Sequence, residues 1–155
     1  MSRKLLLVMC LMLFMLSACG EREDPSNPKL GNHPPTPKLT AGGKSITTHQ
    51  STYCWGKLGC VDYVNPEEML KDEMKNIVKP NTVITIQIDG KQPNELYLYI
   101  DNKDETDDGL ITSNQFETPS EPGIYYYALS ASWLSEDKKF NEGSSSYAFA
   151  IEVKD

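Results

Sequence analysis

Two cysteines six positions apart are the residues whose spacing most directly predicts a chemistry. They lie in the segment Ser51-Thr52-Tyr53-Cys54-Trp55-Gly56-Lys57-Leu58-Gly59-Cys60-Val61-Asp62-Tyr63. Gly56 and Gly59 permit a sharp turn, which brings Cys54 and Cys60 within bridging distance. We expect a disulfide that stiffens this loop and fixes Trp55 as a candidate binding residue.

Two other uses of the cysteine pair need partners that the sequence supplies poorly. A structural zinc site takes four Cys or His ligands, and only His49 and acidic side chains are available to complete the set. A redox pair normally has Cys-x-x-Cys spacing, which is absent between Cys54 and Cys60. The disulfide is therefore the preferred interpretation.

Acidic residues are concentrated in a second segment, at 101–109. Counted from Asp104, positions one, three and five hold Asp104, Thr106 and Asp108, which is part of a calcium-loop pattern. Position twelve is Gln115 instead of Glu, and no helices are expected on either side. We expect an acidic turn, with Asp104, Thr106 and Asp108 as candidate metal ligands.

The sequence contains no pattern typical of catalysis. Nucleophilic catalysis needs a base beside a Ser or Cys, and His49 is the one histidine beyond the proline-rich segment that contains His33. No P-loop, dinucleotide fingerprint or His-Glu-x-x-His motif occurs. We therefore expect a protein that is not an enzyme and uses no cofactor, with an envelope hydrolase as the third-ranked possibility.

The first residues have the pattern of a secretory signal. A basic start, Arg3-Lys4, precedes an uncharged apolar run at 5–16 and two small residues at 17–18. The run is shorter than the roughly 20 residues that a membrane-spanning helix needs. We therefore expect residues 1–18 to be a signal peptide that is removed.

The end of this signal resembles the lipobox of bacterial lipoproteins. The residues are Leu16-Ser17-Ala18-Cys19. The resemblance implies that Cys19 carries a diacylglyceryl group and palmitate-type acylation, with two acyl chains giving stable membrane anchoring. The expected location is therefore extracytoplasmic and lipid-anchored to the cell membrane.

Composition divides the remaining chain into a tether and one domain. Residues 19–37 hold the lipidated cysteine and five prolines, which favours an extended spacer, and residues 38–155 have the length of one domain. The formal net charge is −7 and becomes more negative when the signal leaves with two basic residues. Such a chain is unsuited to bind nucleic acid, and its oligomeric state is left open.

Period-two alternation of apolar side chains predicts a β-rich domain. The four strongest stretches carry their apolar side chains at Ile84, Ile86 and Ile88; at Leu96, Leu98 and Ile100; at Tyr125, Tyr127, Leu129, Ala131 and Trp133; and at Tyr147, Phe149, Ile151 and Val153. Weaker strands are expected at 37–41, 45–53 and 110–117, and one short helix at 66–74 with Asn65 as its cap.

About seven strands at this spacing predict an all-β, antiparallel sandwich, with a small barrel as the alternative. The run Glu121-Pro122-Gly123-Ile124-Tyr125 resembles the tyrosine corner of immunoglobulin-like domains. We therefore expect an immunoglobulin-like sandwich with the short helix in an insertion.

Alternation also predicts where tyrosines face outward. If Leu96, Leu98 and Ile100 point inward, Tyr97 and Tyr99 point outward, and Tyr126 does so on a neighbouring strand. Tyrosine is enriched at recognition surfaces, so Tyr97, Tyr99, Tyr126 and Trp55 are the candidate binding residues. The alternative is that these rings are covered or pack internally.

The cysteine segment also resembles a group of known proteins. Ser-Thr-Tyr-Cys-Trp followed by Cys-Val-Asp-Tyr and a proline is similar to a segment of small lipoproteins, and of the outer part of some membrane-bound regulators, of Bacillus-type bacteria. The likeness covers about 37–80 and departs at Gln50, where the group usually has Gly. It implies the compartment and the disulfide but no activity.

We therefore expect a lipid-anchored binding module of the bacterial cell envelope. Its partner would be an envelope protein or peptide. A calcium- or metal-responsive module is the alternative function.

Overall fold

The computed structural model describes the backbone of residues 30–102 and 105–155, and the side chains of 30–100 and 109–155. The predicted signal peptide at 1–18, the lipidation site Cys19 and the first part of the predicted tether lie outside the described residues.

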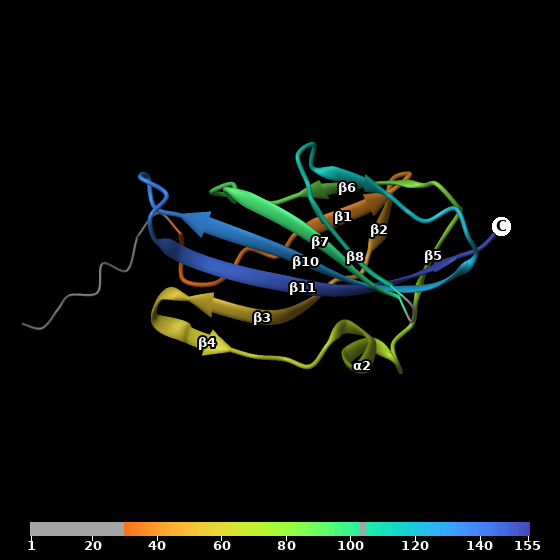
Figure 1. The fold of residues 1–155 in the computed structure, drawn as a ribbon, viewed down its shortest axis with the longest axis horizontal. Coiled ribbons are helices and arrows are strands. Elements are labelled where there is room, and N and C mark those ends of the chain that lie inside the picture. Colours follow the sequence, from red (N-terminus) through yellow and green to blue (C-terminus); the bar gives the residue numbers. More distant parts are fainter. Residues whose placement is uncertain (1–29, 103–104) are drawn as a thin grey trace, which may run out of the picture.

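The described chain forms two β-sheets and one short α-helix (Figure 1). One sheet has the strand order β2-β1-β6-β9, and the other has the order β4-β3-β11-β10-β7-β8, with β5 beside β11. The strands are β1 (Lys38–Ala41), β2 (Lys44–Ile46), β3 (His49–Trp55), β4 (Gly59–Val61), β5 (Asn76–Val78), β6 (Val83–Gln87), β7 (Glu95–Asn102), β8 (Glu105–Leu110), β9 (Gln115–Glu117), β10 (Gly123–Leu134) and β11 (Asn141–Val153), and the helix is α2 (Pro66–Leu70).

The order of the strands confirms the expected all-β sandwich. β7, β10 and β11 are antiparallel neighbours, as strands C, F and G are in an immunoglobulin-like domain. β6 lies between β1 and β9 in the other sheet, as strand B lies between strands A and E. The described residues hold eleven strands instead of about seven, because the strand predicted at 45–53 is divided into β2 and β3, and β4, β5 and β8 were not predicted.

The segment from β3 to β5 extends the larger sheet past β11. β3 pairs antiparallel with residues 143–148 of β11, and β4 continues the sheet outward (Figure 1). β5 then pairs in parallel with residues 151–153 of the same strand. β11 therefore has neighbours along both of its edges.

Alternating side chains fill the space between the sheets, as the sequence predicts. On the long strand β10, residues 125, 127, 129, 131 and 133 are all buried, and their neighbours in sequence are more exposed. Tyr127 stacks on Phe149 with ring centroids 4.8 Å apart. Trp133 meets Trp55 edge to face at 5.0 Å. These aromatic pairs add directional packing to the burial of apolar surface.

The tyrosine corner is present at the start of β10. The hydroxyl of Tyr125 donates to the carbonyl oxygen of Glu121 over 3.0 Å. This bond ties the strand to the turn before it, in agreement with the sequence-based prediction.

The helix begins where predicted and ends four residues early. Asn65 Oδ1 accepts a bond from Glu68 N over 2.8 Å, and Pro66 occupies the first turn. Leu70 is the helix's one buried residue, whereas Met74 is 94% exposed. Because no apolar contact would hold another turn, the predicted helix at 66–74 is reduced to Pro66–Leu70.

The second half of the predicted tether belongs to the domain. Leu30 packs against the core, and Pro37 is buried. The indole of Trp55 donates to the carbonyl of Gly31 over 3.2 Å, and the hydroxyl of Tyr147 donates to the carbonyl of Pro35. The predicted boundary at 37/38 is therefore too late, because buried aromatic donors need the carbonyls that this segment supplies.

The acidic segment at 101–109 is a hairpin instead of a long turn. β7 continues to Asn102, and β8 runs from Glu105 to Leu110, so the strands pair up to Asn102 and Glu105. The prediction missed β8 because Asp-rich segments have low strand propensity. Asp104 lies outside the described residues, as do the side chains of Thr106 and Asp108.

Candidate binding surface

The disulfide expected in the cysteine segment is present. Cys54 and Cys60 lie directly opposite each other in β3 and β4, with their Cα atoms 4.0 Å apart, and are bonded. Between them, Gly56 and Gly59 have positive φ angles of 40° and 72°, which explains the glycines in this turn. With both sulfurs in the bond, neither is available as a zinc ligand.

Trp55 is a core residue, and its prediction as a binding residue is wrong. Its side chain is 3% exposed and lies between Trp133 and the segment at Gly31. Gly143 makes this possible, because a Cβ there would lie 2.8 Å from the Trp55 ring. Trp55 shares the period-two positions of Ser51 and Tyr53, whose side chains face the core, and this alternation is the signal in the sequence that could have identified it.

The outer surface of β7, β10 and β11 carries tyrosines beside small residues. Tyr97 and Tyr99 point away from the core, and their rings stack with centroids 6.4 Å apart. The register places Ser130 opposite Tyr97 and Ala128 opposite Tyr99. Farther across the sheet, Ser146 lies opposite Ser130. Tyr97 and Tyr99 therefore stand at one side of a low, serine-lined strip.

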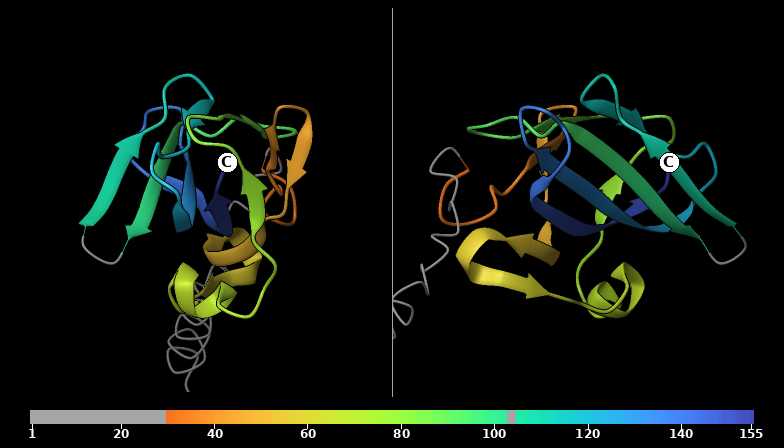
Figure 2. Two further views of the ribbon diagram at one scale, coloured as in Figure 1. Left: turned by 90° about the vertical axis from the view of Figure 1, so that its right-hand side faces the viewer. Right: turned by 60° about the vertical axis from the view of Figure 1, so that its left-hand side comes forward.

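The third predicted tyrosine is partly covered. Tyr126 packs against a small cluster formed by Leu70 of α2 with Ala148 and Ala150. The Lys75 ammonium lies 5.5 Å from the centre of the Tyr126 ring. The predicted patch is therefore divided, because Tyr126 packs in the contact between α2 and the sheet. Figure 2 shows the backbone of α2 beside the strands of this sheet.

We call the remaining open area the tyrosine–serine face. It consists of Tyr97, Tyr99, Ala128, Ser130, Ser132, Ser144 and Ser146. Tyr99 is 37% exposed, and the other members are half-buried. The serine hydroxyls can donate or accept, and Ser146 Oγ is 3.3 Å from Ser130 Oγ. Such a surface offers aromatic area next to polar groups that can adapt to a partner.

The edge of this face is fixed by a glutamine. The Gln50 amide donates to Ser145 Oγ over 2.8 Å and to the carbonyls of Ser51 and Ser146. The β3–β11 register shifts between Ser145 and Tyr147, so the glutamine satisfies groups that the irregular ladder leaves unpaired.

The side chains of the predicted metal ligands Asp104, Thr106 and Asp108 lie outside the described residues. Across the described part of the chain, no three His, Cys, Asp or Glu side chains gather in a way that suits a metal ion. His49 is half-buried in β3 opposite Ala148, which is a structural position in a strand. Within residues 30–102 and 105–155, no helix has the length and apolar character needed to cross a membrane.

Two buried tyrosines have perturbed acidity. Burial raises the pKa of Tyr147 to about 12. Burial and the nearby Tyr125 raise the pKa of Tyr127 still further. Tyr147 is bonded to Pro35, whereas the Tyr127 hydroxyl has no hydrogen-bond partner among the described residues. Both shifts follow mainly from burial in the core.

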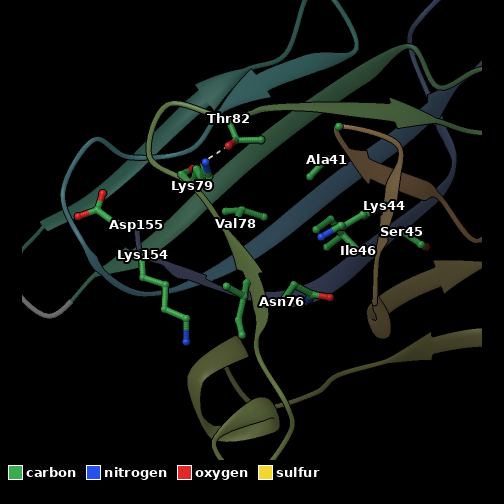
Figure 3. A pocket seen from close by; sticks show the side chains of 12 residues that line it. Ala41, Lys44, Ser45, Ile46, Asn76, Val78, Lys79, Thr82, Lys154 and Asp155 are labelled. Carbon is green, nitrogen blue, oxygen red and sulfur yellow. Dashed lines mark hydrogen bonds between the residues drawn. The ribbon is translucent and has the colours of Figure 1, made fainter.

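A groove that the sequence did not predict opens along one side of the sandwich. It lies between the edge strands β2 and β5 and has a volume of about 550 Å³ (Figure 3). No local pattern reveals it, because its two walls are separated by about thirty residues of inserted chain and meet only in the folded protein.

No protein-family model, curated protein or solved structure matches this chain.

Proposed function

We propose that this protein is a lipid-anchored binding module of the bacterial cell envelope. Its working surface is the tyrosine–serine face, and its partner is an envelope protein or peptide. The observation that carries the proposal is the outward-facing, stacked pair Tyr97 and Tyr99 beside a strip of serines on an otherwise regular sheet.

The physical case for binding rests on what this surface leaves open. α2 covers one end of the sheet with Leu70 and leaves the rest of the outer surface without a covering element among the described residues. Stacked tyrosines are already ordered, so a partner gains apolar contact without a large loss of side-chain entropy. The serines permit close approach of a partner's backbone.

The proposed location is supported by the sequence and by the disulfide. A bridged pair such as Cys54 and Cys60 persists in an oxidising compartment outside the cytoplasm. With acylation at Cys19, residues 20–29 would link the lipid to the docked segment that begins at Leu30. At about 3.1 Å per residue this link would reach about 30 Å, so the domain would stay close to the membrane.

The anchor is tested by labelling cells with radioactive palmitate. The wild-type protein should incorporate label and fractionate with membranes, and a Cys19→Ser variant should do neither. Unlabelled wild-type protein in the cytoplasmic fraction would refute the proposed location.

The binding surface is tested by crosslinking in intact cells followed by mass spectrometry. The double variant Tyr97→Ser/Tyr99→Ser should lose the crosslinked partner, and its midpoint of unfolding should stay near that of wild type because both rings are on the outside. Tyr63→Ser is the matched control, since Tyr63 is 48% exposed and lies outside the tyrosine–serine face. Equal capture by all three proteins would disprove the assignment, as would unfolding of the double variant.

A further inference from the structure

The groove between β2 and β5 presents two unpaired strand edges. β2 pairs with β1 on one side only, and β5 pairs with β11 on one side only. Their other edges face each other across the groove (Figure 3). Free strand edges readily pair with an additional extended chain, and proteins usually block them when no such partner exists.

The backbone groups that face the groove can be identified from the register. Gly42 and Gly43 form a two-residue turn, so Ala41 and Lys44 are a hydrogen-bonded pair and Ser45 points its N–H and C=O away from β1. On the other wall, the carbonyl of Val78 accepts a bond from Lys154 N over 3.0 Å. Ile77, the preceding residue, therefore points its own N–H and C=O into the groove.

At one end of the groove, a side chain of β5 bridges the space between the two walls. The Asn76 side chain accepts from Thr47 N over 3.0 Å and donates to Thr47 O over 3.5 Å. Its amide thus occupies the position that a neighbouring strand would take next to Thr47. At Ser45, two residues earlier, no described group takes that role.

The lining has an apolar floor and a basic rim. Ala41, Ile46 and Val78 are buried along the floor. Lys44 and Lys79 are exposed at the rim and have no carboxylate partner among the described residues. Two further charges, Lys154 and Asp155, line the groove, and Lys154 is paired with Glu152 at 3.1 Å.

The charge of the rim contrasts with that of the whole chain. The formal net charge is −7, yet the groove combines two unpaired lysines with a single acidic lining residue, Asp155. A groove of this volume lies within the range of ligand-binding sites. The site therefore favours a ligand that is both extended and acidic.

From these features we infer that the β2–β5 groove binds an extended acidic peptide by strand addition. The peptide backbone pairs with the free groups of Ser45 and Ile77. Its apolar side chains face the floor, and its carboxylates contact Lys44 and Lys79. This site is separate from the tyrosine–serine face and does not depend on it.

The test uses full-length protein in detergent micelles and three fluorescent synthetic peptides. The first has Glu-Val repeats, the second has Lys-Val repeats, and the third has Glu-Pro repeats, whose prolines cannot pair as a strand. The Glu-Val peptide should bind at least tenfold more tightly than either of the others. Its binding should perturb the amide resonances of Ser45 and Ile77.

Two pairs of variants separate charge from backbone pairing. Lys44→Glu/Lys79→Glu should weaken binding of the Glu-Val peptide at least tenfold, whereas two exposed lysines that do not line the groove, changed as Lys57→Glu/Lys138→Glu, should not. Ile77→Pro removes the N–H that faces the groove and should weaken binding, whereas Ile77→Ala keeps it and should bind normally.

Several outcomes would overturn the inference. Equal binding of the Glu-Val and Glu-Pro peptides would mean a simple anion site without strand pairing. Equal binding of the Glu-Val and Lys-Val peptides would remove the role of the lysines. Absence of binding by the Glu-Val peptide, in protein whose Lys154 amide remains protected from hydrogen exchange, would exclude the site itself. None of these results bears on capture of a partner by Tyr97 and Tyr99.

Discussion

The hydroxyl groups of Tyr125 and Tyr127 lie two residues apart in β10 and meet different surroundings. Tyr125 donates to Glu121, whereas Tyr127 is fully buried without a hydrogen-bond partner among the described residues. A buried hydroxyl without a partner costs free energy, because it has lost its bonds to water. The hydroxyl groups of these two tyrosines therefore contribute to the free energy of folding with opposite sign.

This contrast gives the first prediction. Tyr125→Phe should lower the free energy of unfolding by about 1 kcal/mol, because it removes a made hydrogen bond. Tyr127→Phe should leave it unchanged or raise it, because the ring stays stacked on Phe149 and only the unpaired oxygen is lost. Urea unfolding followed by circular dichroism measures both. A larger loss for Tyr127→Phe than for Tyr125→Phe would contradict this account.

The close approach of Gly143 to Trp55 gives a second prediction at the same scale. Gly143→Ala should lower the free energy of unfolding by about 1–3 kcal/mol, because the new methyl group would displace the indole from its packed position. Gly109→Ala is the control, since nothing lies within 4 Å of a Cβ there. Thermal unfolding should separate the two variants, and similar midpoints would show that the Trp55 site is less tightly packed than described.

The acidity of Tyr147 predicts how stability depends on pH. Its pKa is raised from 10.0 to about 12 by burial, so folding favours the neutral phenol. This contribution is complete below about pH 10 and is lost as the pH rises toward 12. Stability of the wild type should therefore fall in this window, and Tyr147→Phe should show a shallower decline. Parallel declines in the two proteins would show that Tyr147 does not control the transition.

At the scale of elements, the β3–β4 hairpin is the clearest addition to the sandwich. It is attached to β11 along one edge and closed at its end by the Cys54–Cys60 bond. The short loop means that the bond restricts the unfolded chain only modestly. The hairpin positions Trp55 against the core and leaves the bonded cysteines exposed.

Removal of the bond should therefore weaken the protein without unfolding it. The double variant Cys54→Ser/Cys60→Ser should lose about 2 kcal/mol of unfolding free energy. Reduction of the wild type with dithiothreitol should give the same loss, and reduction of the variant should give none. If reduction left the wild-type midpoint unchanged, the bond would have no stabilising role.

At the scale of the whole molecule, the N-terminal segment at 30–37 joins the domain to whatever precedes it. It contacts the hairpin through Trp55 and the long strand through Tyr147. It enters at the end of the sandwich that carries the β10–β11 turn, whereas β2 and β5, which line the groove, lie toward the end where C is marked (Figure 1). The groove is therefore turned away from the point where the anchor would attach.

Shortening the chain tests whether this segment is structural. A protein that begins at Leu30 should be as stable as the full-length chain, and one that begins at Lys38 should lose about 2–3 kcal/mol, from two hydrogen bonds and the burial of Leu30 and Pro37. Chemical unfolding measures the difference. Equal stability of the two shortened proteins would show that residues 30–37 are a free tether after all.

The sequence alone determined the elements whose signals are local. Alternation identified β6, β7, β10 and β11, and the run at 121–125 identified the tyrosine corner. The cysteine spacing identified the disulfide, and Asn65-Pro66 marked the start of α2. Each of these depends on residues close together in the chain, where backbone preference and side-chain period are fixed by the residues themselves.

Only the tertiary structure decided which surfaces stay open. Trp55 and Tyr126 are aromatic residues in strands, as Tyr97 and Tyr99 are. Gly143 of β11 leaves room for the Trp55 ring in the core, and α2 covers Tyr126. Likewise, Ser45 and Ile77 face each other only in the folded protein, because β2 lies at the edge of one sheet and β5 pairs with β11 of the other. Exposure depends on packing between segments distant in sequence, so it cannot be derived from local periodicity.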